Sequence, residues 1–553
     1  MTPESQGNRD NRMNRSVLGK AGACPLLESW VIFISHQWLG RDHPDPQGEQ
    51  LAVLQDALGR LMAGQMKVEH DAAVQFFRKG RTLTKAECSK LQDAYIWLDY
   101  FSVPQMVPDS AREEQLKHIN SIPYYVHSSE LFLAVVPRCF HEDGDLCGES
   151  TWLQRGWCRT EMWCKLLQVS DVSDIPIIFV TAGDLARFAL PRWIWYPVHS
   201  GQFTLEADRQ SCCHVVQEAL KHKILERKQQ NDLQRYRLLL ALFEHLVGLP
   251  LKQRDVEEFL ADFAFDSQQN SRAQAGVGPI ACAALAGDCG MIRSLLSAGA
   301  SLHTHAHVDE LIGILPGFTP LHMACHFRSS ALEPLQTLLE LRADPHATSG
   351  ATPAPLNFCR TAEAVELLVQ HGASVNAATT LFKWAPIHTM AMGGVPPETL
   401  AKMLELRADP NGAAGGSPPL GFLAYVGNSN AHLIESAQLL IDKTADVNRL
   451  YQTEGIWRFI ELSCRAYSMC SREPPLLMSV FANMTTTPLG FCTLFGCEDL
   501  AVFLLKSRAD PEILNNRGLS PIQLASTSKL RQVAAVAPAH YLYLSDNLQI
   551  AYF

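Results

Sequence analysis

A phrase that recurs six times in the second half of the chain constrains the fold most strongly. It consists of leucines, a small or basic residue and then an alanine, which in several copies is followed by Asp or Asp-Pro. The alanines of the six copies are Ala300, Ala343, Ala373, Ala408, Ala445 and Ala509. Repetition of this kind indicates small helical units that cannot bury their apolar faces alone and must stack. An all-α repeat array is therefore expected over residues 276–530.

A helix-opening phrase stands about twenty residues before most of these copies. The clearest is Gly317-Phe318-Thr319-Pro320-Leu321-His322-Met323-Ala324, and a second is Ala385-Pro386-Ile387-His388. Weaker copies lie at 419–420 and 487–489, and 520–525 has the pattern of a terminal half repeat. Thr319 can cap a helix, and Pro320 fits the first helical position, where no intrahelical amide partner is needed.

These two phrases together resemble the ankyrin repeat, which implies a surface that binds another protein. Six to seven repeats are expected, but the alanines are separated by 43, 30, 35, 37 and 64 residues, whereas the usual period is about 33. Family members prefer glycine, with a positive φ, at the end of the second helix. Arg342, Arg407 and Arg508 replace that glycine here, so these turns are expected to be strained or differently shaped.

The gap of 64 residues holds an insertion at about 449–486, with Trp457, Cys464 and Cys470. One interpretation is a segment that projects from one face and carries partner specificity. The alternative is a degenerate repeat that still packs as helices. The sequence favours neither.

The first half of the chain has a different pattern, in which short apolar runs alternate with helical stretches. The runs lie at 30–34, 94–98, 130–137 and 175–180. Strands that alternate with helices predict an α/β domain with a parallel, doubly wound sheet at 25–200. In such sheets ligands bind beyond the carboxyl ends of the strands. The residues expected there are Ser35, His36, Trp38, Arg41 and Asp99.

The stretch Arg155-Gly156-Trp157-Cys158-Arg159-Thr160-Glu161-Met162-Trp163 opens another helix of this domain. It places a carboxylate and two arginines within seven residues. Glu161 is then either a structural ion-pair partner of Arg155 or Arg159, or a working acid.

Three phrases of this domain resemble the heterokaryon-incompatibility (HET) and TIR domains. They are Ser35-His36-Gln37-Trp38-Leu39-Gly40, the run Trp97-Leu98-Asp99-Tyr100-Phe101-Ser102-Val103-Pro104-Gln105, and Arg155-Gly156-Trp157-Cys158-Arg159-Thr160-Glu161. The last matches the TIR pattern Trp-Cys-x-x-Glu. Histidine replaces the usual tyrosine of the first motif, and Pro104 departs from the second.

The resemblance implies cleavage of the nicotinamide–ribose bond of NAD, with Glu161 as the catalytic carboxylate. An oxocarbenium-like transition state is one that a carboxylate can stabilise. Trp38 or Trp157 would stack on a ring, and Arg41, Arg155 or Arg159 would hold the pyrophosphate. Asp99 is a second candidate acid. The structural alternatives stay open: a hydrogen-bonded His36, core tryptophans, and a domain that signals by assembly alone.

Composition limits the remaining classes. The net charge is −10, which argues against a dominant nucleic-acid surface. No apolar run approaches the length of a membrane span, and no secretory signal is seen. The 16 cysteines show no Cys-x-x-Cys pair, so reduced thiols and no metal site are expected. No cofactor is implied, although NAD is a candidate substrate.

The complete prediction is a cytoplasmic signalling adaptor. It has a disordered lead-in at 1–24, the TIR/HET-like α/β domain, a helical connector and linker at 201–275, the ankyrin array and a tail at 531–553. A protein partner is expected on the repeats. Self-association is expected to involve the amino-terminal domain or the connector.

Overall fold

The computed structural model describes residues 30–525, except 71–80, 104–116, 120, 169–176, 190–192, 266–276, 308, 310–312, 350–351, 381, 414–416, 426, 428–429, 431, 451, 454 and 472–474. The predicted lead-in at 1–24, the last part of the predicted connector and linker, from residue 266, and the tail at 531–553 lie outside the described residues.

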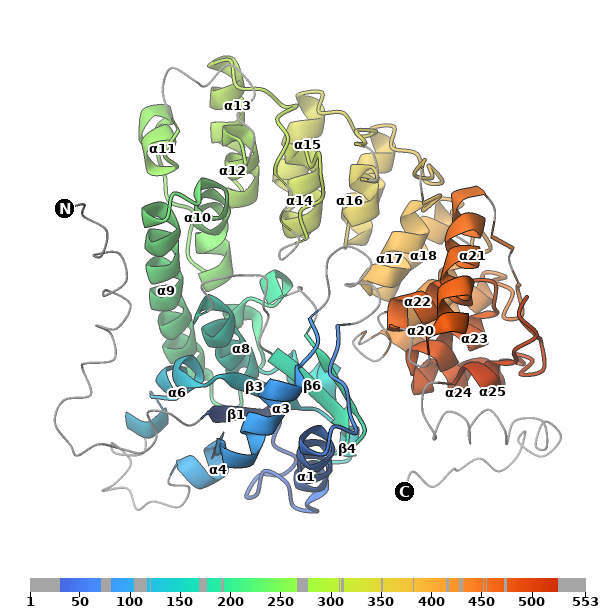
Figure 1. Cartoon of the computed structure of the whole chain (residues 1–553). Coiled ribbons are helices and arrows are strands. Elements are labelled where there is room, and N and C mark those ends of the chain that lie inside the picture. The colour runs from blue at the N-terminus through green and yellow to red at the C-terminus, as the bar shows by residue number, and fades with distance from the viewer. Residues whose placement is uncertain are drawn as a thin grey trace, which may run out of the picture.

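A five-stranded sheet organises the first domain, in the strand order β2-β1-β3-β6-β7 (Figure 1). Its strands are β1 (Val31–His36), β2 (Tyr95–Leu98), β3 (Leu131–Val135), β6 (Ile177–Ala182) and β7 (Leu185–Phe188). The first four are parallel, as predicted. β7 runs antiparallel to β6, because the two residues between them allow a hairpin but no crossover. The sheet is therefore mixed. A separate hairpin pairs β4 (Cys139–Phe140) with β5 (Leu146–Cys147).

Helices cover both faces of the sheet, and the alternation of side chains along β1 shows which residues face which helix. Ile32 and Ile34 pack in one apolar cluster with α1 (Glu49–Met62). Phe33 packs in the other cluster with α8 (Gly156–Gln168). Successive strand residues point to opposite faces, so the last two residues of β1, Ser35 and His36, are directed to different sides of the sheet. Shorter helices complete the domain: α3 (Lys85–Lys90), α4 (Asp99–Ser102), α6 (Ile122–Ser128) and α7 (Glu149–Trp152).

The connector consists of α9 (Glu206–Gln229), α10 (Leu233–Val247) and α11 (Val256–Asp262). α9 contacts α8 of the first domain, and α10 contacts both α9 and the first repeat helix, α12 (Pro279–Ala286). One apolar cluster of buried residues therefore runs from the sheet through the connector into the repeats.

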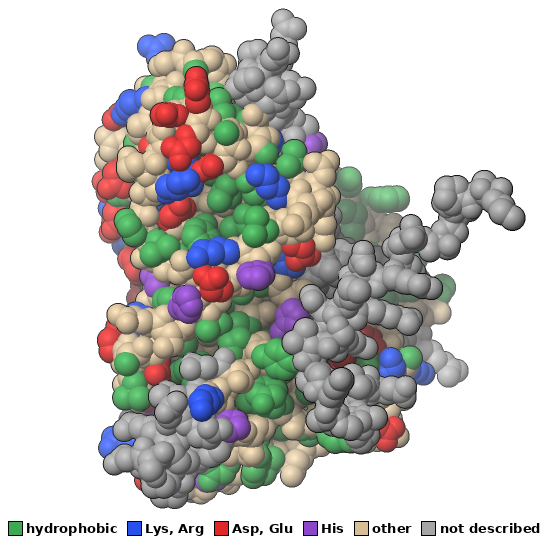
Figure 2. Space-filling model, turned by 90° about the vertical axis from the view of Figure 1, so that its left-hand side faces the viewer, with side chains coloured by type: hydrophobic (Ala, Val, Ile, Leu, Met, Phe, Trp, Pro, Cys, Tyr) green, Lys and Arg blue, Asp and Glu red, His purple; other side chains and the backbone are tan. Residues whose placement is uncertain are grey.

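On the face that Figure 2 shows, basic side chains of described residues stand singly among acidic and hydrophobic ones.

The second half of the chain is a curved stack of helix pairs that arches beside the sheet domain (Figure 1). After α12 its elements are α13 (Cys289–Ser297), α14 (Pro320–Arg328), α15 (Leu332–Glu340), η7 (Pro355–Phe358), α16 (Ala362–Gln370), α17 (Pro386–Gly393), α18 (Pro397–Glu405), α19 (Pro419–Phe422), α20 (Leu433–Asp442), α23 (Pro488–Phe495), α24 (Glu498–Lys506) and α25 (Pro521–Leu524). The Thr319 side chain caps α14 by accepting from the His322 amide, and Pro320 occupies its first turn.

The second helix of each of these repeats ends in the same left-handed turn. The turn residues are Gly299, Arg342, Gly372, Arg407, Thr444 and Arg508, with φ from 66° to 93°. In each turn the amide of the following alanine donates to the carbonyl five residues earlier at 2.9 Å, as Ala408 does to Met403. This is the Schellman pattern. Of the two expected alternatives, a strained turn or a differently shaped one, the structure has the first, because arginine and glycine form one kind of turn and arginine stands there at positive φ.

Asparagines join neighbouring turns along the array. The Asn376 side chain donates to the Arg407 carbonyl at 2.9 Å and accepts from the Asp409 amide at 3.1 Å. Asn411 bridges to Thr444 and Asp446 in the same way, and Asn448 to Arg508 and Asp510. The Asn448 bridge spans the 64-residue gap. α24 therefore packs directly on α20, although the inserted residues lie between them in the sequence.

Two helices occupy that gap, α21 (Gly455–Cys470) and α22 (Leu476–Ala482), and they pack on each other. The buried carboxylate of Glu461 holds α21 to the array. Arg458, Arg465, Thr453, Thr485 and Asn516 all donate to it. Among the described helices of the chain, none combines the length and the apolar character needed to cross a bilayer.

Replacing Arg407 with glycine is expected to stabilise the array. A side chain in the left-handed region costs about 1–2 kcal/mol, and the greater freedom of glycine in the unfolded chain offsets part of the gain. The Arg407→Gly variant should thus gain about 0.5–1 kcal/mol in free energy of unfolding, measured by urea titration. Arg407→Ala is the control, because it keeps the Cβ and should gain little. Equal gains in both variants would contradict an origin in backbone strain.

Candidate functional site

The first part of the site lies between β1 and α8. The Ser35 hydroxyl donates to Glu161 Oε2 at 2.5 Å and accepts from Trp152 Nε1 at 3.0 Å. Ser35 and Trp152 are buried, and the carboxyl group of Glu161 is enclosed beside them, although the Glu161 residue as a whole is partly exposed. Glu161 reaches this position because α8 begins at Gly156, against which the Phe203 ring packs. A Cβ at Gly156 would lie 2.0 Å from that ring.

Glu161 has an unusual protonation behaviour for a carboxylic acid. Burial raises its pKa from the ordinary 4.5 to about 8, and the negative charge of Asp99 acts in the same direction. The hydrogen bond from Ser35 and the charge of His36 oppose the shift. At neutral pH the group is therefore mostly a neutral acid that can donate a proton, and it becomes a carboxylate only above about pH 8.

The second part of the site lies on the α1 side of β1. His36 Nε2 is 2.9 Å from Asp99 Oδ1, and His36 Nδ1 is 2.8 Å from Gln50 Oε1. The other oxygen of Asp99 accepts from Trp38 Nε1 at 2.9 Å, and Oδ1 also accepts from the Tyr100 amide at 2.7 Å. The imidazole is thus held between two acceptors, which suits its protonated form.

The pKa shifts of this pair agree with that geometry. Burial alone would lower the pKa of His36, but the hydrogen bond and charge of Asp99 outweigh it and raise the pKa. Burial would raise the pKa of Asp99, but His36 and Trp38 lower it. Together the two residues form an ion pair beside the neutral acid Glu161.

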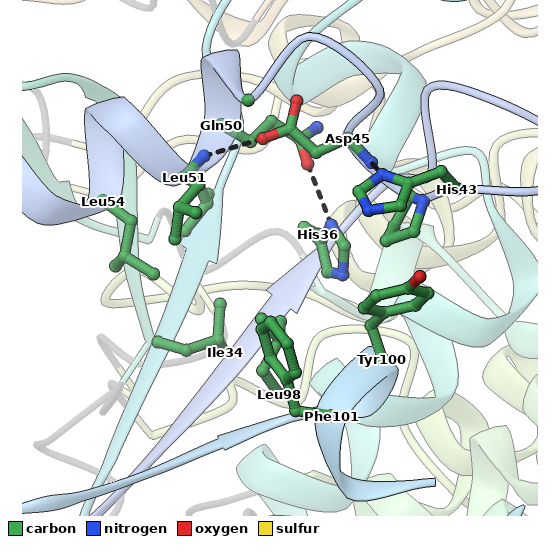
Figure 3. A pocket seen from close by; sticks show the side chains of 13 residues that line it. Ile34, His36, His43, Asp45, Gln50, Leu51, Leu54, Leu98, Tyr100 and Phe101 are labelled. Atoms are coloured by element: carbon green, nitrogen blue, oxygen red, sulfur yellow. Dashed lines mark hydrogen bonds between the residues drawn. The ribbon is translucent and has the colours of Figure 1, made fainter. Parts of the chain in front are cut away.

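A small cavity opens beside His36, on the α1 side of the sheet (Figure 3). Its volume is about 130 Å³, well below the 300 Å³ or more of ordinary ligand pockets. Its walls are mostly apolar, with Ile34, Leu54, Leu98 and Phe101 labelled in Figure 3, and His43 and Tyr100 stand at one side. A space of this size accepts one small ring and excludes a whole dinucleotide.

Both parts of the site lie at the carboxyl end of β1. The strand order reverses between β1 and β3, which is the switch point where open α/β sheets bind their ligands. The sheet thus brings together five of the predicted residues: Ser35, His36, Trp38, Asp99 and Glu161.

The other predicted residues have different partners. Arg41 is exposed and pairs with Glu142 and Asp143. Arg155 donates to Thr204 Oγ1, and Trp157 donates to Asp208. None of these three contacts is with Glu161.

Arg159 is buried and donates to the carbonyls of Leu153 and Pro197 and to Ser200. Burial lowers its pKa to about 10, so it remains charged. The structural alternative of an ion pair between Glu161 and Arg155 or Arg159 is therefore not formed.

Sequence reasoning missed three neighbours of the site: Gln50, Trp152 and Tyr100. Tyr100 follows Asp99 directly, so the strand end could have indicated it. Gln50 and Trp152 lie in helices with no local polar signal, and only the fold places them. Within the described part of the chain, no cluster of three His, Cys, Asp or Glu side chains could hold a metal ion.

Comparison with known proteins bears on the second half of the chain. A family model described as the ankyrin repeat matches residues 316–350. This chain contains an ankyrin repeat. The matched residues include α14 and α15, the helix pair that follows the Thr319 cap.

Solved ankyrin structures also align with the chain. The ankyrin repeat domain of human ASB11 covers 47% of this chain and 97% of its own length, at 18% identity and a TM-score of 0.34. The ankyrin repeat domain of Bcl-3, described as a unique member of the IκB family, covers 47% and 100%, at 17% identity and a TM-score of 0.32. No curated protein matches the sequence.

The raised pKa of Glu161 predicts how stability depends on pH. Because the folded-state pKa lies above the unfolded value, the contribution of Glu161 to stability is complete below about pH 4.5 and is lost as the pH rises through about 8. Wild type should therefore lose more unfolding free energy than Glu161→Gln between about pH 5 and about pH 9, measured by urea titration.

The matched control is Glu257→Gln, on the exposed first turn of α11, which should follow wild type. Parallel pH profiles for wild type and Glu161→Gln would contradict the raised pKa.

Proposed function

We propose that this chain is an intracellular adaptor that binds a protein partner through its ankyrin array and carries a TIR/HET-like effector module at its amino-terminal end. The observation that carries the proposal is the matched ankyrin repeat within a stack of similar helix pairs. Such arrays commonly act as protein-binding surfaces. The described cysteines are all free thiols, which agrees with a reducing compartment.

The inserted helix α21 is the part of the array that we propose carries partner specificity. Its outward side chains are largely apolar, and five of them are 48–84% exposed: Ile456, Phe459, Leu462, Tyr467 and Met469. Its inward face is fixed by Trp457, Cys464 and the Glu461 network. Several exposed large apolar side chains on one helix are typical of protein interaction sites. The occupant that we propose is the apolar face of a partner helix, one of the recurring forms of protein recognition.

The test is quantitative affinity capture with the full chain as bait. Phe459→Ser combined with Met469→Ser should lose at least one protein that wild type retains, with at least a tenfold drop in recovery. The control is Leu225→Ser, an exposed apolar position on α9 that is 58% accessible, and it should retain that protein. Thermal denaturation confirms that each bait is folded. Identical retention by wild type and the double variant would contradict a role for α21.

A second candidate is hydrolysis of the nicotinamide–ribose bond of NAD, which the HET/TIR resemblance implies. It is favoured by the freedom of Glu161 from arginine partners and by its position at the switch point beside Ser35. In this reaction ionised Glu161 would stabilise positive charge that develops on the ribose. The 130 Å³ cavity lies on the α1 side of the sheet and Glu161 does not line it, so NAD would have to reach Glu161 from outside that cavity. Self-association of the module would raise the local concentration of active sites.

Nicotinamide release from NAD by the purified full chain tests this candidate. Wild type at high protein concentration should release nicotinamide, and Glu161→Gln should lower the rate by about a hundredfold or more. Glu257→Gln is the matched carboxylate control and should leave the rate unchanged. Because the carboxylate form is required, the rate should rise as the pH approaches about 8. No release by wild type, even when clustered, would leave the adaptor as the function.

A further inference from the structure

A tryptophan of the sheet domain reaches the second and third repeats of the array. It is Trp195, the last residue of the short helix η5 (Trp193–Trp195). Its indole Nε1 donates to the His326 carbonyl at 3.3 Å, and the two rings meet edge to face with centroids 5.4 Å apart. The Arg360 guanidinium lies 3.8 Å from the centre of the indole ring. These contacts match what an indole offers, which is an N–H donor and an electron-rich face.

The array fixes Arg360 for this contact with residues of its own. The Arg360 amide donates to Ser329 Oγ at 3.2 Å, and the Arg360 carbonyl accepts from Thr399 Oγ1 at 2.9 Å. Both hydroxyl side chains are buried. Arg360 Nη1 also donates to the Gly393 carbonyl at 3.4 Å. The groups that receive the indole are therefore held in place by neighbouring repeats, and the sheet domain supplies only the indole.

The main chain around Trp195 is held on the sheet domain by separate contacts. Ile194 is buried in the apolar cluster that includes α8. On the other side, the Tyr196 carbonyl accepts from Trp163 Nε1 of α8 at 2.9 Å. Trp195 itself is only partly buried. Its side chain can therefore leave the array while its neighbours in the sequence stay on α8.

We infer that His326 and Arg360 form a tryptophan-binding site on the array, which Trp195 occupies as an internal ligand and which a tryptophan of a partner segment takes by exchange. The occupant in the structure shows which chemistry fits the site. A tethered ligand has an effective concentration of about millimolar, so an incoming tryptophan has to compete with Trp195. The exchange with a partner rests on the proposed adaptor function, whereas the site itself does not.

Calorimetric titration of the full chain with acetyl-Gly-Trp-Gly-amide tests the inference. The Trp195→Ala variant vacates the site and should bind this peptide at millimolar concentration. Wild type should bind it about tenfold more weakly, because the peptide has to displace the tethered indole. Equal binding by the two chains, or no binding by Trp195→Ala, would overturn the inference.

Two further peptides test the chemistry of recognition in the Trp195→Ala variant. The peptide with leucine at its centre should not bind. The peptide with 1-methyltryptophan lacks the N–H donor to the His326 carbonyl, and it should bind about fivefold more weakly than the tryptophan peptide. Binding of the leucine peptide as tight as that of the tryptophan peptide would overturn the inference.

A second substitution in the Trp195→Ala chain locates the bound peptide. Arg360→Gln should weaken the tryptophan peptide about fivefold, because the cation above the ring is lost. Arg293→Gln, at an exposed arginine of α13, is the matched control and should leave the affinity unchanged. Peptide binding that Arg360→Gln does not weaken would place the peptide elsewhere and overturn the inference.

The Trp195→Phe variant serves if Trp195→Ala does not fold, as judged by thermal denaturation. Phenylalanine keeps an aromatic ring but loses the hydrogen bond of the internal ligand, so this variant should bind the tryptophan peptide about fivefold more tightly than wild type. Equal binding would overturn the inference. Affinity capture through α21 does not involve these residues, so failure of the peptide test and failure of the adaptor proposal are distinguishable.

Discussion

The left-handed turn that ends each second repeat helix is the constraint on which the array depends. In all six turns the helix is closed by the same backbone bond, and the alanine that donates it is buried. The turn sets the direction in which the chain leaves the helix, so it also sets the place of the next repeat. Three of these turns hold an arginine: Arg342, Arg407 and Arg508. The free energy gained when the repeats stack therefore exceeds the conformational cost of an L residue at positive φ.

The asparagine bridges extend this constraint from one repeat to the next. Because Asn448 joins Arg508 and Asp510 across the insertion, α21 and α22 add surface without breaking the stack. The apolar cluster that passes from β1 through α9 and α10 to α12 ties the array to the sheet domain. The ion pair of Arg138 with Asp499 adds a second contact at the far end of the array. The array is therefore joined to the sheet domain by a packed apolar cluster at its first repeat and by an ion pair at its far end.

The sequence predicted the features that depend on local pattern. Buried strands appear as β-branched apolar runs, and repeats as recurring phrases, so both could be read without a structure. The site was predicted in part. Strand ends identified Ser35, His36 and Asp99, and the motif around Glu161 identified the acid. The partners of Arg155 and Arg159 could not be predicted, because Thr204, Pro197 and Ser200 come from a later segment that covers the start of α8. No motif around residue 155 or 159 encodes that contact. The role of the two arginines at a pyrophosphate stays a prediction.

Side-chain alternation along β1 also explains why the site holds two different proton states. Ser35 is directed to α8 and His36 to α1. Adjacent residues of β1 therefore contact different groups: Ser35 contacts the neutral acid Glu161, and His36 forms an ion pair with Asp99. Asp99 raises the pKa of Glu161 through its charge, and His36 lowers it. A cationic group bound near Ser35 would add to the effect of His36 and lower the pKa of Glu161 further. Binding of a cation and ionisation of Glu161 are thus linked: the acid would release its proton when a positive charge arrives, and the carboxylate would form where it can stabilise that charge.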